Sequence, residues 1–102
     1  MTYEGLKKAL AIFGLGERAT LRQIKARHRK LVKAHHPDHG SSHDPATIAR
    51  INAAHAILMD YCENYRFSFS EEEFLEQRPE ERIKRQFGWD PVWGGKQEGD
   101  DE

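Results

Sequence analysis

The apolar residues of this chain recur every three or four positions, which is the period of an amphipathic helix. A first short helix is predicted over residues 4–13, and Gly14 and Gly16 are expected to end it. The apolar side of this helix consists of Leu6, Ala9, Leu10 and Phe13.

A second helix is predicted after Thr20, which is a good N-cap. Gln23 stands three residues later, where it completes a capping box. We expect this helix to continue to Pro37, because the proline disfavours helical backbone at His36 and has no N–H of its own. Its apolar side consists of Leu21, Ile24, Leu31 and His35.

A third helix is predicted from Asp44, which can cap it, and Pro45, which suits the first helical position. It follows a loop over residues 39–43 and extends to about Tyr65. Its apolar stripe steps by three and four residues through Ile48, Ile51, His55, Leu58, Cys62 and Tyr65. Two such helices joined by a short loop pack as an antiparallel hairpin, so the predicted class is all-α, with the first helix closing one end of the hairpin.

The remainder of the chain carries weaker helix signals. Ser70 and Glu73 predict a second capping box with a short helix over residues 71–77, and Pro79 opens another over about 80–87. These are the C-terminal short helices of the predicted fold.

We therefore expect three parts: a helical core over residues 1–66, an aromatic extension over 67–95, and a disordered acidic tail over 96–102. Within the extension, residues 88–95 cannot form a regular helix. Its large apolar side chains are Phe67, Phe69, Phe74, Leu75, Phe87, Trp89, Val92 and Trp93. They either pack on the core and enlarge it, as we expect, or bind a client or partner.

The charge of the chain is unevenly distributed. The net charge is -1, but residues 1–70 sum to +5 and residues 71–102 to -6. The second helix carries no acidic residue between Leu21 and His36. Its cations are Arg22, Lys25, Arg27, Arg29, Lys30 and Lys33. Such a surface suits a solvated face, a nucleic-acid backbone or an acidic protein surface.

Several classes are disfavoured by the sequence. There is no run of about 18 apolar residues and no secretory signal pattern, so a cytoplasmic protein without membrane contact is expected. The single cysteine, Cys62, excludes an internal disulfide and lies on the apolar stripe of the third helix, as a structural thiol would. There is no phosphate-binding loop, nucleophile elbow or carboxylate pair, so no enzyme activity and no cofactor are expected.

The basic helix ends at His36, Pro37 and Asp38, and in this context the sequence resembles the J-domain of DnaJ proteins. Residues 24–38 resemble the second helix and loop of that family. Gly14-Leu15 resembles its turn after the first helix, and residues 51–58 resemble its third helix. The resemblance covers about residues 3–60 and preserves the spacing between the three blocks.

The resemblance implies a co-chaperone that binds the nucleotide-binding domain of a DnaK-type chaperone near its interdomain linker and stimulates ATP hydrolysis. The family's histidine-proline-aspartate signature falls on His36, Pro37 and Asp38. Its other contact positions fall on Lys25, His28, Arg29 and Lys30.

Two departures from the family pattern concern histidines. His28 and His55 stand where the family usually has tyrosine. We expect His28 on the exposed side, with its flat ring available for contact, and His55 in the core or at its boundary. The sequence also lacks the glycine/phenylalanine-rich segment and cysteine-pair zinc region of full DnaJ proteins, which predicts a J-domain-only protein.

Two rival functions remain open from the residues alone. A small basic-helix domain can bind nucleic acid, but the acidic tail and the lack of a base-reading pattern argue against it. A histidine-rich segment can bind metal, although no cysteine or carboxylate completes a standard ligand spacing. The histidines concerned are His28, His35, His36, His39 and His43.

Overall fold

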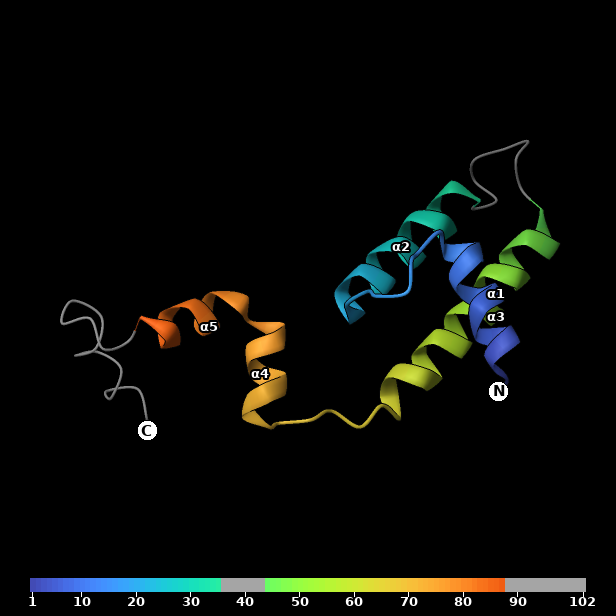
Figure 1. Cartoon of the computed structure of the whole chain (residues 1–102). Helices are drawn as coiled ribbons and strands as arrows, with labels where there is room; N and C mark the ends of the chain where they lie inside the picture. The colour runs from blue at the N-terminus through green and yellow to red at the C-terminus, as the bar shows by residue number, and fades with distance from the viewer. Residues whose placement is uncertain (36–43, 88–102) are drawn as a thin grey trace. The chain divides into compact units, whose positions relative to one another are not determined.

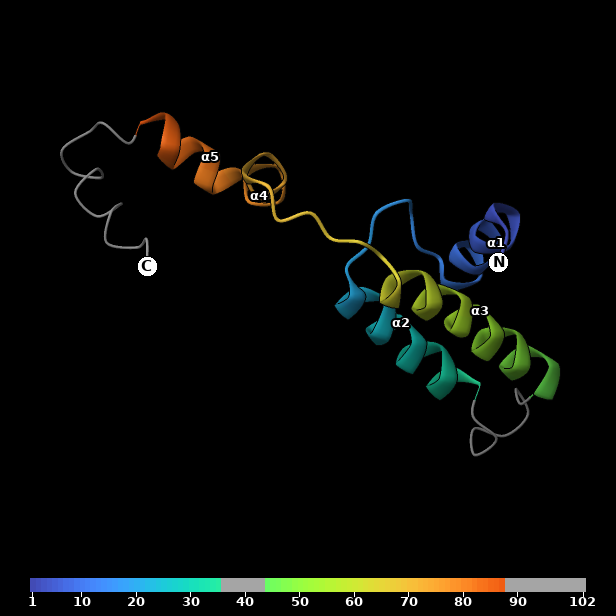
Figure 2. The same ribbon diagram turned by 90° about the horizontal axis from the view of Figure 1, so that it is seen from below.

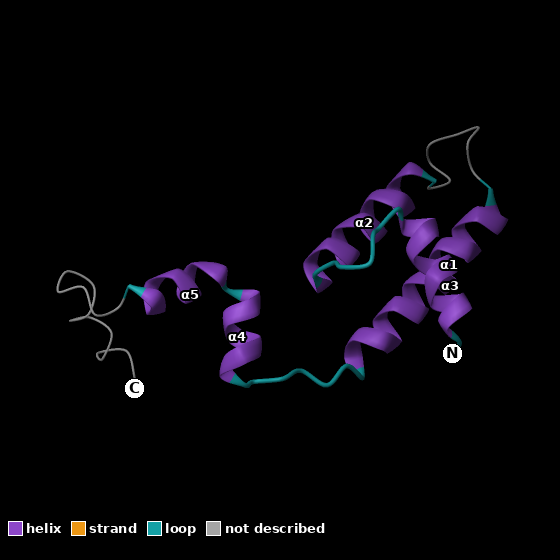
Figure 3. Ribbon diagram, viewed as in Figure 1, coloured by secondary structure: helices purple, strands orange, loops and turns teal. Residues whose placement is uncertain are grey.

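The structure is a computed structural model that describes residues 1–35 and 44–87. Within these ranges all regular structure is helical (Figures 1 and 3), which confirms the predicted all-α class. The helices are α1 (Tyr3–Phe13), α2 (Leu21–Ala34), α3 (Pro45–Glu63), α4 (Glu71–Gln77) and α5 (Pro79–Gln86). The predictions for residues 39–43, 88–95 and 96–102 fall outside the described residues.

The chain divides into two compact units, residues 1–65 and 66–102, and each is described by itself. In the first unit, α2 and α3 run side by side in opposite directions (Figures 1 and 2), which is the predicted hairpin. The fully buried core joins all three helices of this unit. It consists of Ala9, Phe13, Ile24, Ile51, Ala54 and Leu58.

The position of α1 differs from the prediction. We expected α1 to close one end of the hairpin, but it packs alongside α3, and Ala9 and Phe13 share the core with residues from the middle of that helix. The physical reason is the apolar side of α1, where Ala9 and Phe13 stand four residues apart and are buried in one core with residues of α3. Phe13, only 1% exposed, anchors this contact.

The helix starts follow the predicted caps. Thr20 Oγ1 accepts a hydrogen bond from the N–H of Gln23 at 3.1 Å, and Gln23 Oε1 accepts one from the N–H of Thr20 at 2.7 Å. At the start of α3, the Asp44 carboxylate accepts from the N–H of Ala46 at 3.1 Å and Pro45 takes the first helical position. Both helices therefore begin where their local sequence predicts.

The helix ends are shorter than predicted. Helix α2 ends at Ala34 with His35 as its C-cap, so the chain leaves the helix before the residue that Pro37 restricts. Helix α3 ends at Glu63, and the N–H of Tyr65 donates to the carbonyl of Cys62, three residues back, at 3.2 Å. The side-chain amide of Asn64 donates to the backbone carbonyl and the carboxylate of Asp60, both at 2.9 Å, and so satisfies acceptors at this helix end.

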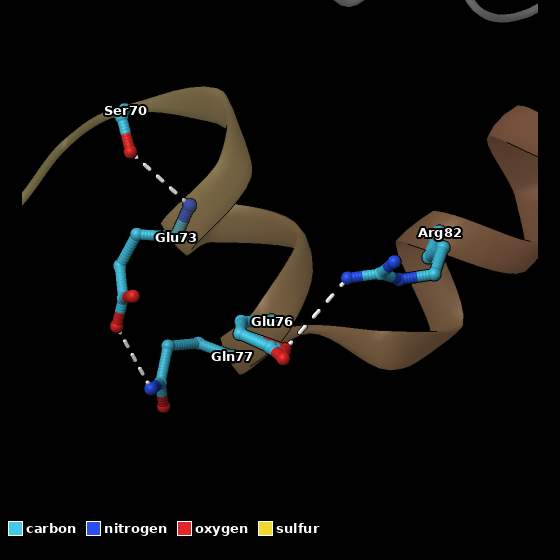
Figure 4. Close-up of polar contacts among 5 residues, drawn as sticks. All are labelled: Ser70, Glu73, Glu76, Gln77 and Arg82. Carbon is cyan, nitrogen blue, oxygen red and sulfur yellow. Dashed lines mark hydrogen bonds and ion pairs between the residues drawn. The ribbon is translucent and has the colours of Figure 1, made fainter.

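In the second unit, α4 and α5 cover the predicted short helices, but the capping box is only half formed. Ser70 Oγ accepts from the N–H of Glu73 at 3.1 Å (Figure 4), whereas the Glu73 carboxylate accepts from the side-chain amide of Gln77 at 3.0 Å. The N–H of Ser70 donates to Ser68 Oγ instead. A competing local acceptor has replaced the Glu73 side chain in this cap.

Ion pairs join α4 to α5. Glu76 and Arg82 lie 3.7 Å apart (Figure 4), and Arg85 pairs with Glu71. All four side chains are more than half exposed, so each pair contributes little to stability.

Candidate functional site

Helix α2 presents a stripe of positive charge to solvent. Arg22, Lys25, Arg29 and Lys33 step by three, four and four residues, which aligns them along one face of the helix, and Lys30 lies beside Lys33. All five are exposed. We call these five residues the basic stripe. It contains Lys25, Arg29 and Lys30, three of the predicted contact residues.

Arg27, the sixth cation of α2, has a different role. Its guanidinium donates a hydrogen bond to the backbone carbonyl of Phe13, the last residue of α1. A cation at this end of a helix satisfies an otherwise unpaired carbonyl and interacts favourably with the helix dipole. Arg27 therefore fastens α1 to α2 and is not part of the basic stripe.

The prediction that His28 lies on the exposed side of α2 is wrong. Its ring is half-buried and stacks on His55 of α3, with ring centroids 3.8 Å apart and planes 6° from parallel. Its Nε2 atom also lies 3.2 Å from Oδ1 of Asn52 on α3. The helical period explains the placement, because position 28 lies four residues after Ile24 and three before Leu31, on the apolar side.

Phe13 completes this cluster from α1. Its ring lies nearly parallel to those of His28 and His55, with centroid distances of 6.1 Å and 6.3 Å. We call these three residues the aromatic stack. His55 is half-buried within it, which confirms the predicted boundary position. The pKa of His55 is lowered, first by burial and then by the positive charges of His28 and Lys25.

The histidine-proline-aspartate signature lies outside the described residues. His36, Pro37 and Asp38 fall in residues 36–43, directly after the C-cap of α2, as do His39 and His43 from the metal-binding alternative. Across the residues that are described, no group of three or more histidine, cysteine, aspartate or glutamate side chains is arranged to hold a metal ion.

Comparison with known proteins decides the family. The DnaJ domain model matches residues 8–66, more than half of the chain. This chain belongs to the DnaJ-domain family. The DnaJ domain therefore covers the second half of α1, the whole of α2 and α3, and the signature between them.

A curated relative agrees with this assignment. The "Chaperone protein DnaJ" of Ureaplasma parvum serovar 3 (strain ATCC 700970) is 45% identical over 49 residues. The aligned region is 48% of this chain but only 13% of the relative, so the similarity concerns the DnaJ domain and not the rest of that chaperone. No solved structure matches the chain.

The DnaJ-domain family is one of co-chaperones and not of enzymes. In this DnaJ domain Cys62 is half-buried, and burial followed by the charge of Glu63 raises the pKa of its thiol. A thiol with a raised pKa is protonated at neutral pH and a poor nucleophile, as expected for a structural cysteine. In the part of the chain that the structure covers, no helix is long and apolar enough to cross a membrane.

Proposed function

We propose that this DnaJ domain binds a DnaK-type chaperone through residues 36–38 and the basic stripe of α2, and stimulates its ATP hydrolysis. The observation that carries the proposal is the basic stripe itself. It is a continuous exposed face of cations on a helix without an acidic residue, and it leads directly into the family's signature. The family match spans both features.

The physical role of the basic stripe is to guide association. Like charges spaced three and four residues apart repel one another and disfavour the isolated helix, so this arrangement costs stability. An acidic groove on the chaperone would relieve the repulsion and raise the rate of encounter. Lys25, Arg29 and Lys30 are therefore proposed as contacts with the nucleotide-binding domain and linker.

The proposed triggering step belongs to the signature. The Asp38 carboxylate is proposed to pair with a basic group of the chaperone and to favour its hydrolysis-competent conformation, while His36 and Pro37 orient that carboxylate. Only differential binding to two conformations of the partner can change its rate in this way. The DnaJ domain itself performs no chemistry.

His28 keeps a place in the proposed contact surface through the exposed part of its ring. Because the ring is stacked on His55 and bonded to Asn52, its orientation is set before a partner arrives. A contact residue that is already ordered loses less side-chain entropy on binding.

The decisive experiment measures single-turnover ATP hydrolysis by a DnaK-type chaperone with the full chain and with its His36→Gln variant. We expect the wild type to accelerate hydrolysis, within the range of about 5–150-fold that is typical of coupling between sites. We expect the variant to lose most of this effect. An unaccelerated reaction with the wild type, or equal acceleration by the variant, would show the proposal to be wrong.

The same assay tests the basic stripe by charge reversal. Arg29→Glu should raise the concentration of DnaJ domain needed for half-maximal stimulation, and more strongly at low salt, because it acts on a screened long-range attraction. Lys8→Glu is the matched control, since it makes the same change in net charge at an exposed position of α1. If the two variants had equal effects, the net charge of the chain, and not the basic stripe, would account for the change in stimulation.

A further inference from the structure

The aromatic stack contains two titratable rings in face-to-face contact at the junction of α2 and α3. His28 is contributed by α2 and His55 by α3, with centroids 3.8 Å apart. Two neutral imidazoles pack well in this arrangement. Two imidazolium ions at the same separation repel each other strongly, especially where the rings are partly removed from water.

Within residues 1–35 and 44–87, the ring contacts and the hydrogen bond of the pair bring no negative charge that would offset added positive charge. From α1 the pair is met by the uncharged ring of Phe13, and from α3 by the neutral amide of Asn52. From α2, Lys25 adds a further positive charge that acts on His55. Arg27, the neighbouring cation on α2, is held by the Phe13 carbonyl.

We propose that His28 and His55 form a proton-sensitive contact through which mild acid loosens α2 from α3. The device lies in the hairpin that presents the basic stripe, but it does not rest on the proposed function, because it concerns the stability of the chain alone.

The direction in which stability changes with pH follows from the thermodynamic linkage between proton binding and folding. The pKa of His55 in the folded chain lies below its ordinary value of 6.5, through burial, His28 and Lys25 in that order. The unfolded chain therefore takes up the proton more readily than the folded chain. The stability that depends on neutral His55 is fully present above pH 6.5 and is lost as the pH falls through 6.5 toward the lowered pKa of the folded state.

The direct test is an NMR titration of the histidine ring protons in the full chain. We expect the His55 resonance to titrate with a midpoint below 6.5. His28→Phe should raise this midpoint because it removes the neighbouring charge and keeps a flat ring, and Lys25→Gln should raise it by a smaller amount. A His55 midpoint at its ordinary value, or one that neither variant moves, would overturn the proposal.

Thermal unfolding tests the consequence for the hairpin. Between pH 7.5 and pH 5.5 the wild type should lose about 5 °C more in Tm than a His28→Phe/His55→Phe double variant, which is the size of shift that a modest change in stability makes in a domain of this length. A His39→Gln/His43→Gln variant removes the same number of histidines outside the aromatic stack and should behave as the wild type does.

The NMR titration and the thermal unfolding experiment can each overturn the proposal independently. If the double variant loses as much Tm in acid as the wild type, or if the His39→Gln/His43→Gln variant abolishes the loss, the aromatic stack is not the sensor. If the double variant does not fold, the titration with Lys25→Gln still decides, because Lys25 is exposed and its replacement leaves the stack intact.

Discussion

Gly14 and Arg27 act together at the end of α1. Gly14 has a left-handed φ of 67°, and a Cβ atom added to it would lie 2.9 Å from Nη1 of Arg27. That nitrogen also holds the Phe13 carbonyl, but it is the far end of a flexible side chain and can shift to make room. The left-handed backbone, and not the space around it, is therefore the main reason for a glycine at this position.

Gly14→Ala should therefore lower the free energy of unfolding by about 1–2 kcal/mol, the usual cost of a side chain in left-handed backbone. Urea unfolding followed by circular dichroism would measure it. Gly16→Ala is the matched control: a Cβ there meets nothing within 4 Å and the backbone φ is not positive. We expect that substitution to be neutral or to stabilise by about 0.4–1 kcal/mol. Equal losses at both positions would contradict this account.

At the scale of residues, exposure was predicted correctly where helical period and charge agree. It was predicted wrongly where a polar side chain can either face solvent or pack against a neighbouring helix. The exposure of Lys25, Arg29 and Lys30 follows from helical period and charge. Arg27 was counted among the cations of the second helix, and His28 was assigned to the contact surface through the family resemblance. Both follow Ile24, by three and four residues, and so turn inward. The helical period of α2 was the signal that would have predicted the inward placement of these two residues.

At the scale of elements, the caps decide where helices begin. The Thr20–Gln23 capping box satisfies two otherwise unpaired N–H groups at the start of α2. This matters more than usual here, because the cations of α2 repel one another and its first turn contains no acidic residue to complement the helix dipole.

Thr20→Ala should therefore destabilise the chain by about 1 kcal/mol, the typical cost of losing an N-cap. Thermal unfolding monitored by helical circular dichroism is the measurement. Thr20→Ser keeps the hydroxyl and should retain most of the stability. If Thr20→Ser lost as much stability as Thr20→Ala, the loss would come from the methyl group of Thr20 and not from the capping hydrogen bond of its hydroxyl.

Helix ends and partial caps escaped prediction for a common reason. Several nearby groups compete for the same donors and acceptors, and small geometric differences decide between them. At the end of α3 the N–H of Tyr65 donates to the carbonyl of Cys62, three residues back. Before α4, Ser68 replaces the Glu73 side chain as the acceptor for the N–H of Ser70. Sequence spacing cannot rank such competitors.

At the scale of the whole molecule, the second unit lacks a core of its own in the part that is described. Neither α4 nor α5 buries a side chain. Short helices without burial are marginal in water, so we retain the prediction that residues 67–95 pack on the first unit. The position of α1 beside α3 depends on long-range contacts that local sequence patterns do not encode.

Limited proteolysis of the full chain with chymotrypsin tests this packing. The segment between α3 and α4 contains Tyr65, Phe67 and Phe69, all suitable cleavage sites in non-helical backbone. If the second unit is docked, cleavage there should be slow and should approach the rate at which the chain unfolds globally. Rapid cleavage that leaves the first unit folded would instead show that the aromatic extension is independent, and would favour the alternative that it binds a client or partner.

The capped end of α2 and the capped start of α3 have a consequence for the signature between them. The end of α2 and the start of α3 are held by a common core, so the connection between them has fixed end points. Doubling the length of such a loop costs the fold only about 0.6 kcal/mol in closure entropy. Stability therefore tolerates many lengths of this connection, and we propose that the geometry of the chaperone contact constrains its length more than the fold does.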